Sequence, residues 1–144
     1  MKYTLTRAEF NEATGVSTVV ISTRYGHFKG EVQMQESEQY PSKYFGCELA
    51  EIKALKKAEK ARLRELRAQL DALQSYFCDM MNTRTFDGYS FQMLKLGERM
   101  VELRRNIDVT KHNIKTLSDN YHSLIVQRDA KLAEFYSDRK EGNE

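Results

Sequence analysis

A group of positively charged side chains lies close together in the second half of the chain. Its members are Lys95, Arg99, Arg104 and Arg105, followed by Asn106. Lys95 and Arg99 are four residues apart, so they share one face of a helix. Arginine can hold a phosphate through two parallel N–H bonds, which makes these residues candidates for binding an anionic ligand. The alternative is ordinary pairing along the helix, because Glu98 and Glu102 alternate with the positive residues.

A turn with aromatic residues comes shortly before this group. Phe86 and Tyr89 can stack on a nucleotide base, while Arg84 and Ser90 add polar groups beside them. The alternative is that the two rings cap the end of a helical core. Arg24, at a turn near the N-terminus, is a weaker candidate, because an arginine at such a turn is more often simply exposed to solvent.

No residue pattern typical of catalysis is found in the sequence. It has no glycine-rich phosphate loop, no nucleophile elbow and no paired-carboxylate motif, so we do not expect an enzyme. Cys47 and Cys78 have no histidine at metal-ligand spacing, so we predict free thiols and no metal site. No cofactor is predicted.

The composition narrows the class of protein further. The chain has 144 residues with 23 basic and 21 acidic side chains, a net charge of +2. This balance argues against a dedicated duplex-DNA binder, which usually has a strong basic excess. Hydrophobic residues make up 40% and there is one proline, so the chain is not generically disordered. No apolar run approaches the roughly 18 residues of a membrane span, and no signal peptide is recognised, so we expect a cytoplasmic protein.

Two long helical patterns make up most of the chain, over residues 42–81 and 90–139. The second has apolar residues at alternating steps of three and four, typical of a helix that packs lengthwise on another helix. They are Met93, Leu96, Met100, Leu103, Ile107, Ile114, Leu117, Tyr121 and Leu124, with Thr110 in the one polar position. Asp87 and Gly88 mark a short turn, and Ser90 is a suitable N-cap, so we expect an antiparallel pair.

The N-terminal part reads as a small β region. Residues 16–24 are rich in β-branched side chains and residues 27–34 alternate, so they predict a hairpin with its turn at Tyr25 and Gly26. Thr6 and Glu9 fit a capping box, so a short helix is expected over residues 7–13, stopped by Gly15. The predicted class is α+β, one structural domain: an anchor and hairpin (1–40), a helical hairpin (41–139) and a tail (140–144).

Self-association follows from this architecture. The second helix would be a rod on the order of 65–70 Å long at about 1.5 Å per residue, longer than a small domain is wide. A pair of helices cannot bury both seams fully, whereas two pairs side by side form a four-helix arrangement. A two-stranded hairpin is also marginal alone, so it must pack on the helices or extend with a strand from a second copy. We therefore expect a dimer.

Three features resemble the Thoeris anti-defence type 1 family of small phage proteins. They are the hairpin (VVI at 19–21 and FKGEV at 28–32), the helix opening FGCELAEIKALK at 45–56, and Arg99, Arg104 and Arg105 after the turn with Phe86 and Asp87. The similarity covers about residues 16–125. It implies a sponge that binds nucleotide immune signals without cleaving them, acting in the cytoplasm of an infected bacterium. The implied ligands are glycocyclic ADP-ribose isomers and, in some members, cyclic di- or trinucleotides.

The resemblance also implies an assembly and a site. The assembly is a dimer that can build to a hexamer, with pockets between subunits. Phe86, with Asn82 and Arg84, would lie near a base. Arg99 and Arg104 or Arg105 would lie near phosphate, and Arg24 and Ser90 are further candidates.

Two other functions fit the same sequence. A coiled-coil adaptor that binds another protein would have the same long helices and balanced charge. A weak nucleic-acid binder would use the basic run over residues 53–67. The simpler alternative is that residues 54–62 of this run form a helix face exposed to solvent.

Overall fold

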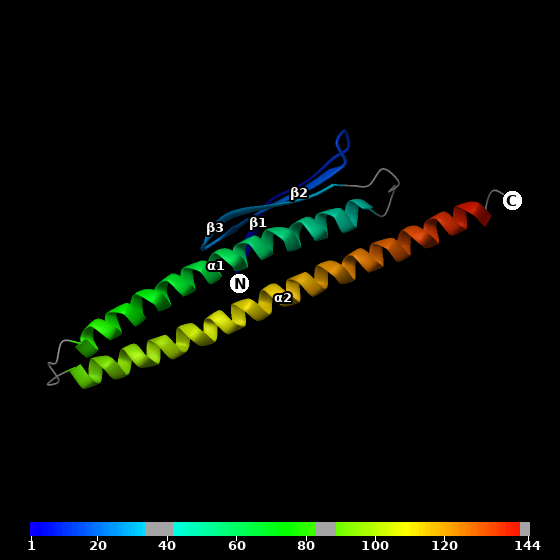
Figure 1. Cartoon of the computed structure of the whole chain (residues 1–144). Coiled ribbons are helices and arrows are strands. Elements are labelled where there is room, and N and C mark those ends of the chain that lie inside the picture. Colours follow the sequence, from blue (N-terminus) through cyan, green and yellow to red (C-terminus); the bar gives the residue numbers. More distant parts are fainter. Residues whose placement is uncertain (34–41, 83–88, 142–144) are drawn as a thin grey trace. The chain divides into compact units, whose positions relative to one another are not determined.

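The computed structural model describes residues 1–33, 42–82 and 89–141 of the chain. Three strands, β1 (Tyr3–Asn11), β2 (Val16–Thr23) and β3 (Gly26–Gln33), precede two long helices, α1 (Ser42–Asn82) and α2 (Tyr89–Glu141) (Figure 1). The predicted α+β class, an N-terminal sheet followed by two long helices that pack against each other, is confirmed. The turn with Arg84 and Phe86 lies outside the described residues.

The chain divides into two compact units, and each long helix contributes to both. The sheet unit consists of Met1–Glu59 and Ile114–Glu144, and the helical unit consists of Lys60–Asn113. The sheet unit therefore contains all three strands, the beginning of α1 and the end of α2.

The sheet is antiparallel, in the order β1-β2-β3. Its β2–β3 hairpin is the one expected from the sequence, with Val19 opposite Gly30 and Ile21 opposite Phe28. Gly26, which begins β3, has φ of 125°, a conformation that a residue with a side chain rarely adopts. The hairpin is not left with two strands, because the N-terminal segment of the same chain adds a third.

The helix predicted over residues 7–13 is wrong, because residues 7–11 belong to β1 and residues 12 and 13 to the turn that follows it. Phe10 pairs with Ser17, and the Thr6 hydroxyl donates to the Val20 carbonyl oxygen at 3.0 Å instead of capping a helix. Gly15 lies in the β1–β2 turn with φ of 71°, and its N–H donates to the Asn11 carbonyl at 2.7 Å. The capping-box pattern is local, and pairing of β1 with β2 as far as Asn11 outweighs it.

The sheet packs directly on the backbone of α1. The face of α1 toward the sheet has a small residue at every fourth position: Gly46, Ala50, Ala54 and Ala58, all buried. On the sheet side Gly30 completes the contact, because a Cβ there would lie 1.8 Å from the Ala50 carbonyl oxygen. Val19, Ile21 and Val32 surround this close approach and form the core with the alanines.

Side chains of α2 complete the core of the sheet unit. Tyr121, Leu124 and Ile125 pack against it, together with Phe28 and Leu55. The predicted solvated face over residues 54–62 is therefore wrong for part of its length. Ala54 and Ala58 are fully buried, and Glu59 is 4% exposed.

Two lysines of the basic run bind the sheet. Lys53 Nζ donates to the Glu31 carbonyl oxygen at 3.1 Å, and Lys57 Nζ donates to the Lys29 carbonyl oxygen at 2.6 Å. Both carbonyls belong to β3, an edge strand. The lysines thus satisfy acceptors that an open edge would offer to another strand.

The helical unit has a core of its own. Leu66 of α1 packs with Leu103 and Ile107 of α2, and half-buried leucines extend the contact. Thr110 is fully buried in the same seam, where its hydroxyl donates to the Asn106 carbonyl at 2.7 Å. The predicted three–four seam of α2 is confirmed at these positions.

The two cysteines are not paired with each other. Cys47 is half-buried beside the core of the sheet unit, and Cys78 is exposed on α1. In the part of the chain that the structure describes, neither helix contains a stretch that is both long enough and apolar enough to cross a membrane.

Candidate functional site

The predicted ligand-binding residues do not all belong to one unit. Arg24 is exposed in the β2–β3 turn of the sheet unit. The others that the structure describes belong to the helical unit: Asn82, Ser90, Lys95, Arg99, Arg104 and Arg105. Asn82 is the last residue of α1 and is exposed. Ser90 is not the N-cap, because α2 already begins at Tyr89.

Lys95 and Arg99 share a face with an aromatic ring that the sequence analysis missed. Lys95 Nζ lies 4.7 Å from the centroid of the Phe91 ring, and this phenylalanine is 63% exposed. Phe91, Lys95 and Arg99 follow one another at intervals of four residues, which aligns them along one side of α2. We call these three residues the cationic–aromatic stripe. The interval of four between an aromatic residue and a lysine is the signal that could have indicated it.

The side-chain pairing expected as the alternative role of the arginines is confirmed for Arg99. Its Nη1 lies 3.1 Å from Oε2 of Glu102, and both side chains are about half exposed. A surface pair of this kind contributes about 0–1 kcal/mol. Guanidinium has five N–H donors, so Arg99 keeps donors for an anionic ligand while it contacts Glu102.

Arg104 and Arg105 lie at different positions around the helix. At 3.6 residues per turn, a residue five positions after Arg99 is rotated by about 140° around the axis. Both arginines are exposed. The positive group of the sequence therefore divides: Arg104 lies on another side of the helix than Lys95 and Arg99, whereas Arg105 lies about 40° around the helix from Phe91, beside the stripe.

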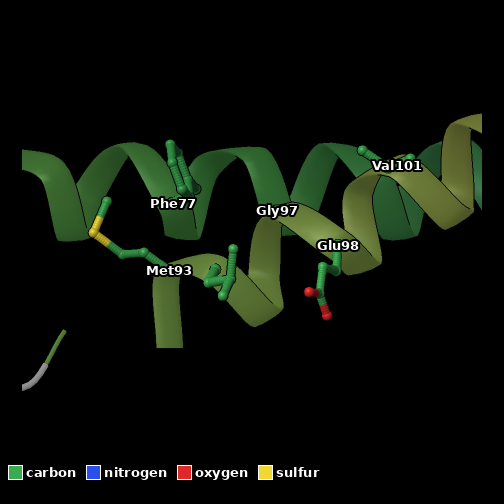
Figure 2. Close-up of a pocket in the computed structure, with 6 residues that line it drawn as sticks. Phe77, Met93, Gly97, Glu98 and Val101 are labelled. Carbon is green, nitrogen blue, oxygen red and sulfur yellow. The ribbon is translucent and has the colours of Figure 1, made fainter. Parts of the chain in front are cut away.

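A shallow apolar groove lies next to the stripe in the helical unit. Its volume is about 670 Å³, and it is lined by Phe77 of α1 and by Met93, Leu94, Gly97, Glu98 and Val101 of α2 (Figure 2). Leu94 and Val101 are 61% and 53% exposed. This second apolar strip of α2 is hard to recognise in the sequence, because the regular packing seam accounts for most of the apolar residues of the helix.

The titratable contacts of the sheet unit include one pair between β1 and α1 and one pair within β3. The Tyr3 hydroxyl donates to Oε1 of Glu51 at 2.5 Å, and this hydrogen bond raises the pKa of Tyr3. Hydrogen bonding to Lys29 Nζ, 2.6 Å away, lowers the pKa of Glu31. These pairs stabilise the surface of the sheet and do not gather around a cavity in the part of the chain that the structure describes.

These side chains offer groups that can bind a ligand. The stripe combines an aromatic face with two positive charges, which suits a ligand with a base and a phosphate. The groove suits an apolar surface. No family model, curated protein or solved structure matches this chain.

Proposed function

We propose that this chain binds an anionic nucleotide signal and sequesters it without cleaving it. The cationic–aromatic stripe is the observation that supports the proposal. Phe91 offers a ring on which a base can stack, and Lys95 and Arg99 offer positive charge along the same side of α2. The resemblance to the Thoeris anti-defence family agrees with this ligand class, and the implied place of action is the bacterial cytoplasm.

Sequestration requires affinity and abundance only. The phosphate charge would be met by the ammonium and guanidinium groups, and stacking on an aromatic ring contributes about 1–3 kcal/mol per base. The cyclic nucleotides named by the resemblance carry both parts. Arg104, Arg105, Asn82 and Arg24 remain candidates for further contacts to such a ligand.

Titration calorimetry tests this proposal directly. The full chain is titrated with the glycocyclic ADP-ribose isomers, cyclic GMP-AMP and cyclic tri-adenylate, and at least one of them is expected to release heat and be recovered intact. Arg99→Gln and Phe91→Ala should each weaken binding by about tenfold or more. Lys115→Gln, which changes an exposed lysine of α2 in the sheet unit, is the matched control. The absence of heat with every ligand would refute the proposal.

An adaptor that binds another protein is the second candidate. The groove of the helical unit favours it, because exposed apolar side chains such as Leu94 and Val101 suit a protein surface rather than a phosphate. A pull-down with the wild-type chain should then return one stoichiometric partner. Leu94→Lys should abolish the capture, and the same substitution should leave nucleotide titration unchanged.

A further inference from the structure

The helical unit has the same three residues, glutamate, leucine and arginine, in the seam of both helices. They are residues 65–67 of α1 and residues 102–104 of α2, and the two leucines are buried in one core. Successive helix residues are rotated by about 100°, so the glutamate and the arginine lie on opposite sides of each leucine. Within this unit the helices run in opposite directions (Figure 1), which places the two residues that follow the leucines on the same side. The unit therefore has an acidic side and a basic side.

The carboxylates of the acidic side have partners within the chain. Glu65 Oε1 accepts a hydrogen bond from Gln69 Nε2 at 3.4 Å, and Glu102 forms the 3.1 Å ion pair described above. On the basic side, Arg67 and Arg104 are exposed, and the ion pairs of the described helix residues include neither of them. Their charges are therefore available to an anion from outside the chain.

Two lysines extend the basic side by about two turns. Lys60 lies seven residues before Arg67, and Lys111 lies seven residues after Arg104, so each lysine is on the same side of its helix as the arginine. Because the helices are antiparallel, both lysines lie in the same direction from the arginines, about 10 Å along the axis. All four side chains are exposed. We call these four residues the basic rows, one on each helix.

Two carboxylates lie beside the basic rows and do not balance them. Asp71 and Asp108 each follow one of the arginines by four residues, and both are exposed. Arg64 adds a further positive charge at the outer edge of α1. Positions that flank a helix–helix seam usually carry opposite charges, whereas the basic rows place cation across from cation. Such like charges repel within the chain, and an anionic partner on this side would relieve the repulsion.

Apolar side chains lie between the basic rows. Leu63 and Leu70 of α1 pack against the core of the helical unit but are only half-buried. Met100 of α2 is also half-buried and lies one turn before Arg104. A ligand made of phosphates alone would leave these side chains uncovered, whereas an amphipathic helix would bury them.

We propose that the basic side binds an acidic amphipathic helix of a partner protein, as a third helix beside α1 and α2. Apolar residues of that helix would cover Leu63, Leu70 and Met100, and carboxylates on its two flanks would face the basic rows. A second copy presenting the same side would place cations against cations, which opposes association. The inference goes beyond nucleotide binding, because the cationic–aromatic stripe lies on another side of α2.

Fluorescence anisotropy of two labelled peptides with the full-length chain tests the inference. Both are designed helices of about three heptads, with leucine at the a and d positions. One has glutamate at e and g and lysine at b and c, and the other has these charges exchanged. We expect the peptide with glutamate flanks to bind at least about tenfold more tightly than the exchanged peptide, and its affinity to fall as salt is added.

Two neighbouring arginines provide matched variants. Arg104→Glu reverses a charge of the basic rows and should weaken binding of the glutamate-flanked peptide by about tenfold or more. Arg105→Glu makes the same change in net charge at an exposed position that points away from α1, and it should bind this peptide like the wild type. The double variant Arg67→Glu with Arg104→Glu should prefer the exchanged peptide. Circular dichroism checks that each variant keeps its helix content.

Three results would overturn the inference. They are no binding of either peptide, equal affinity for both peptides, and an equal loss in Arg104→Glu and Arg105→Glu. A single-stranded oligonucleotide that binds through Arg104 while neither peptide binds would assign the basic side to nucleic acid instead. Nucleotide binding is measured separately by calorimetry, so the two proposals can fail independently.

Discussion

Gly30 shows how one residue positions the whole sheet on its helix. It lies in β3 opposite Val19, and its missing side chain leaves room for the backbone of α1 at Ala50. Because the obstacle is a backbone carbonyl in the middle of a helix, no rotamer change can make room for a larger residue.

Gly30→Ala should therefore destabilise the protein by about 3 kcal/mol or more, since either the sheet or the helix must shift. Gly46→Ala is the graded comparison. Its nearest atom would be the Ser17 hydroxyl, a side-chain oxygen that can rotate, and alanine favours the helix, so a loss of only about 1 kcal/mol is expected. Urea unfolding followed by circular dichroism measures both. Equal losses for the two variants would contradict the direct backbone contact.

Tyr3 links β1 to α1 in a way that depends on pH. Its hydrogen bond to Glu51 raises the pKa of Tyr3 in the folded protein above its unfolded value. The stabilisation is thus complete below the ordinary tyrosine pKa of about 10 and is lost as the pH rises through the folded value. Tyr3 is 41% exposed, so the contribution should be below about 1 kcal/mol.

Tyr3→Phe should remove this alkaline loss, which unfolding experiments between neutral and alkaline pH can detect. Glu51→Gln should reduce it too, because the carboxylate acceptor is gone. In the Glu51→Gln background, Tyr3→Phe is expected to add little to the pH dependence. An unchanged alkaline slope in Tyr3→Phe would show that another group causes it.

At the residue scale, the charged residues of α2 could be identified from the sequence, but only some of the groups that they contact could be predicted. The pairing of Arg99 with a glutamate could be predicted, because intervals of three and four residues fix which side chains meet on a helix. The divergence of Arg104 from Arg99 also follows from helical geometry. The role of Gly30 could not be predicted, since it depends on which surface lies opposite this residue.

At the scale of elements, the long helices were the most predictable part. Their apolar periodicity extends over many turns, whereas β1 is short and its capping-box pattern imitates the start of a helix. The small residues of α1 were also misjudged. Alanines among lysines suggest a solvated face, yet Ala54 and Ala58 are buried because the sheet needs small residues to approach the helix.

Lys53 and Lys57 connect the helix to the sheet edge, and their removal should be measurable. A double substitution, Lys53→Met with Lys57→Met, leaves the Glu31 and Lys29 carbonyls of β3 without these donors. We expect a loss of about 1–2 kcal/mol in the free energy of unfolding and an increased tendency to aggregate through the edge.

The control is Lys60→Met, which removes an exposed lysine of the same helix. It should leave unfolding and light scattering at wild-type levels. The double substitution also tests the nucleic-acid alternative, since a gel shift lost with these two lysines but retained in Lys60→Met would support a role in nucleic-acid binding. Unchanged stability of the double variant would contradict the edge-protection role.

At the scale of the whole molecule, each unit has its own core. The sheet unit is built on the alanines of α1, and the helical unit on leucines and Ile107. The helical unit is the simpler one, with two helices and one seam, and it leaves the groove and the cationic–aromatic stripe exposed. A sequence can predict such a seam, but it does not say what covers the remaining faces.

We propose that the chain binds a nucleotide and releases it unchanged. This proposal is tested by sedimentation velocity of the protein with a cyclic nucleotide, followed at the absorbance of the nucleotide. The chain has no tryptophan, so its own ultraviolet absorbance interferes little. We expect at least one of the proposed ligands to sediment with the wild-type protein and to do so less with Arg99→Gln. The recovered nucleotide should be intact. The proposal would be contradicted if every nucleotide sedimented at the rate of the free ligand, or if the nucleotide were recovered as a cleaved product.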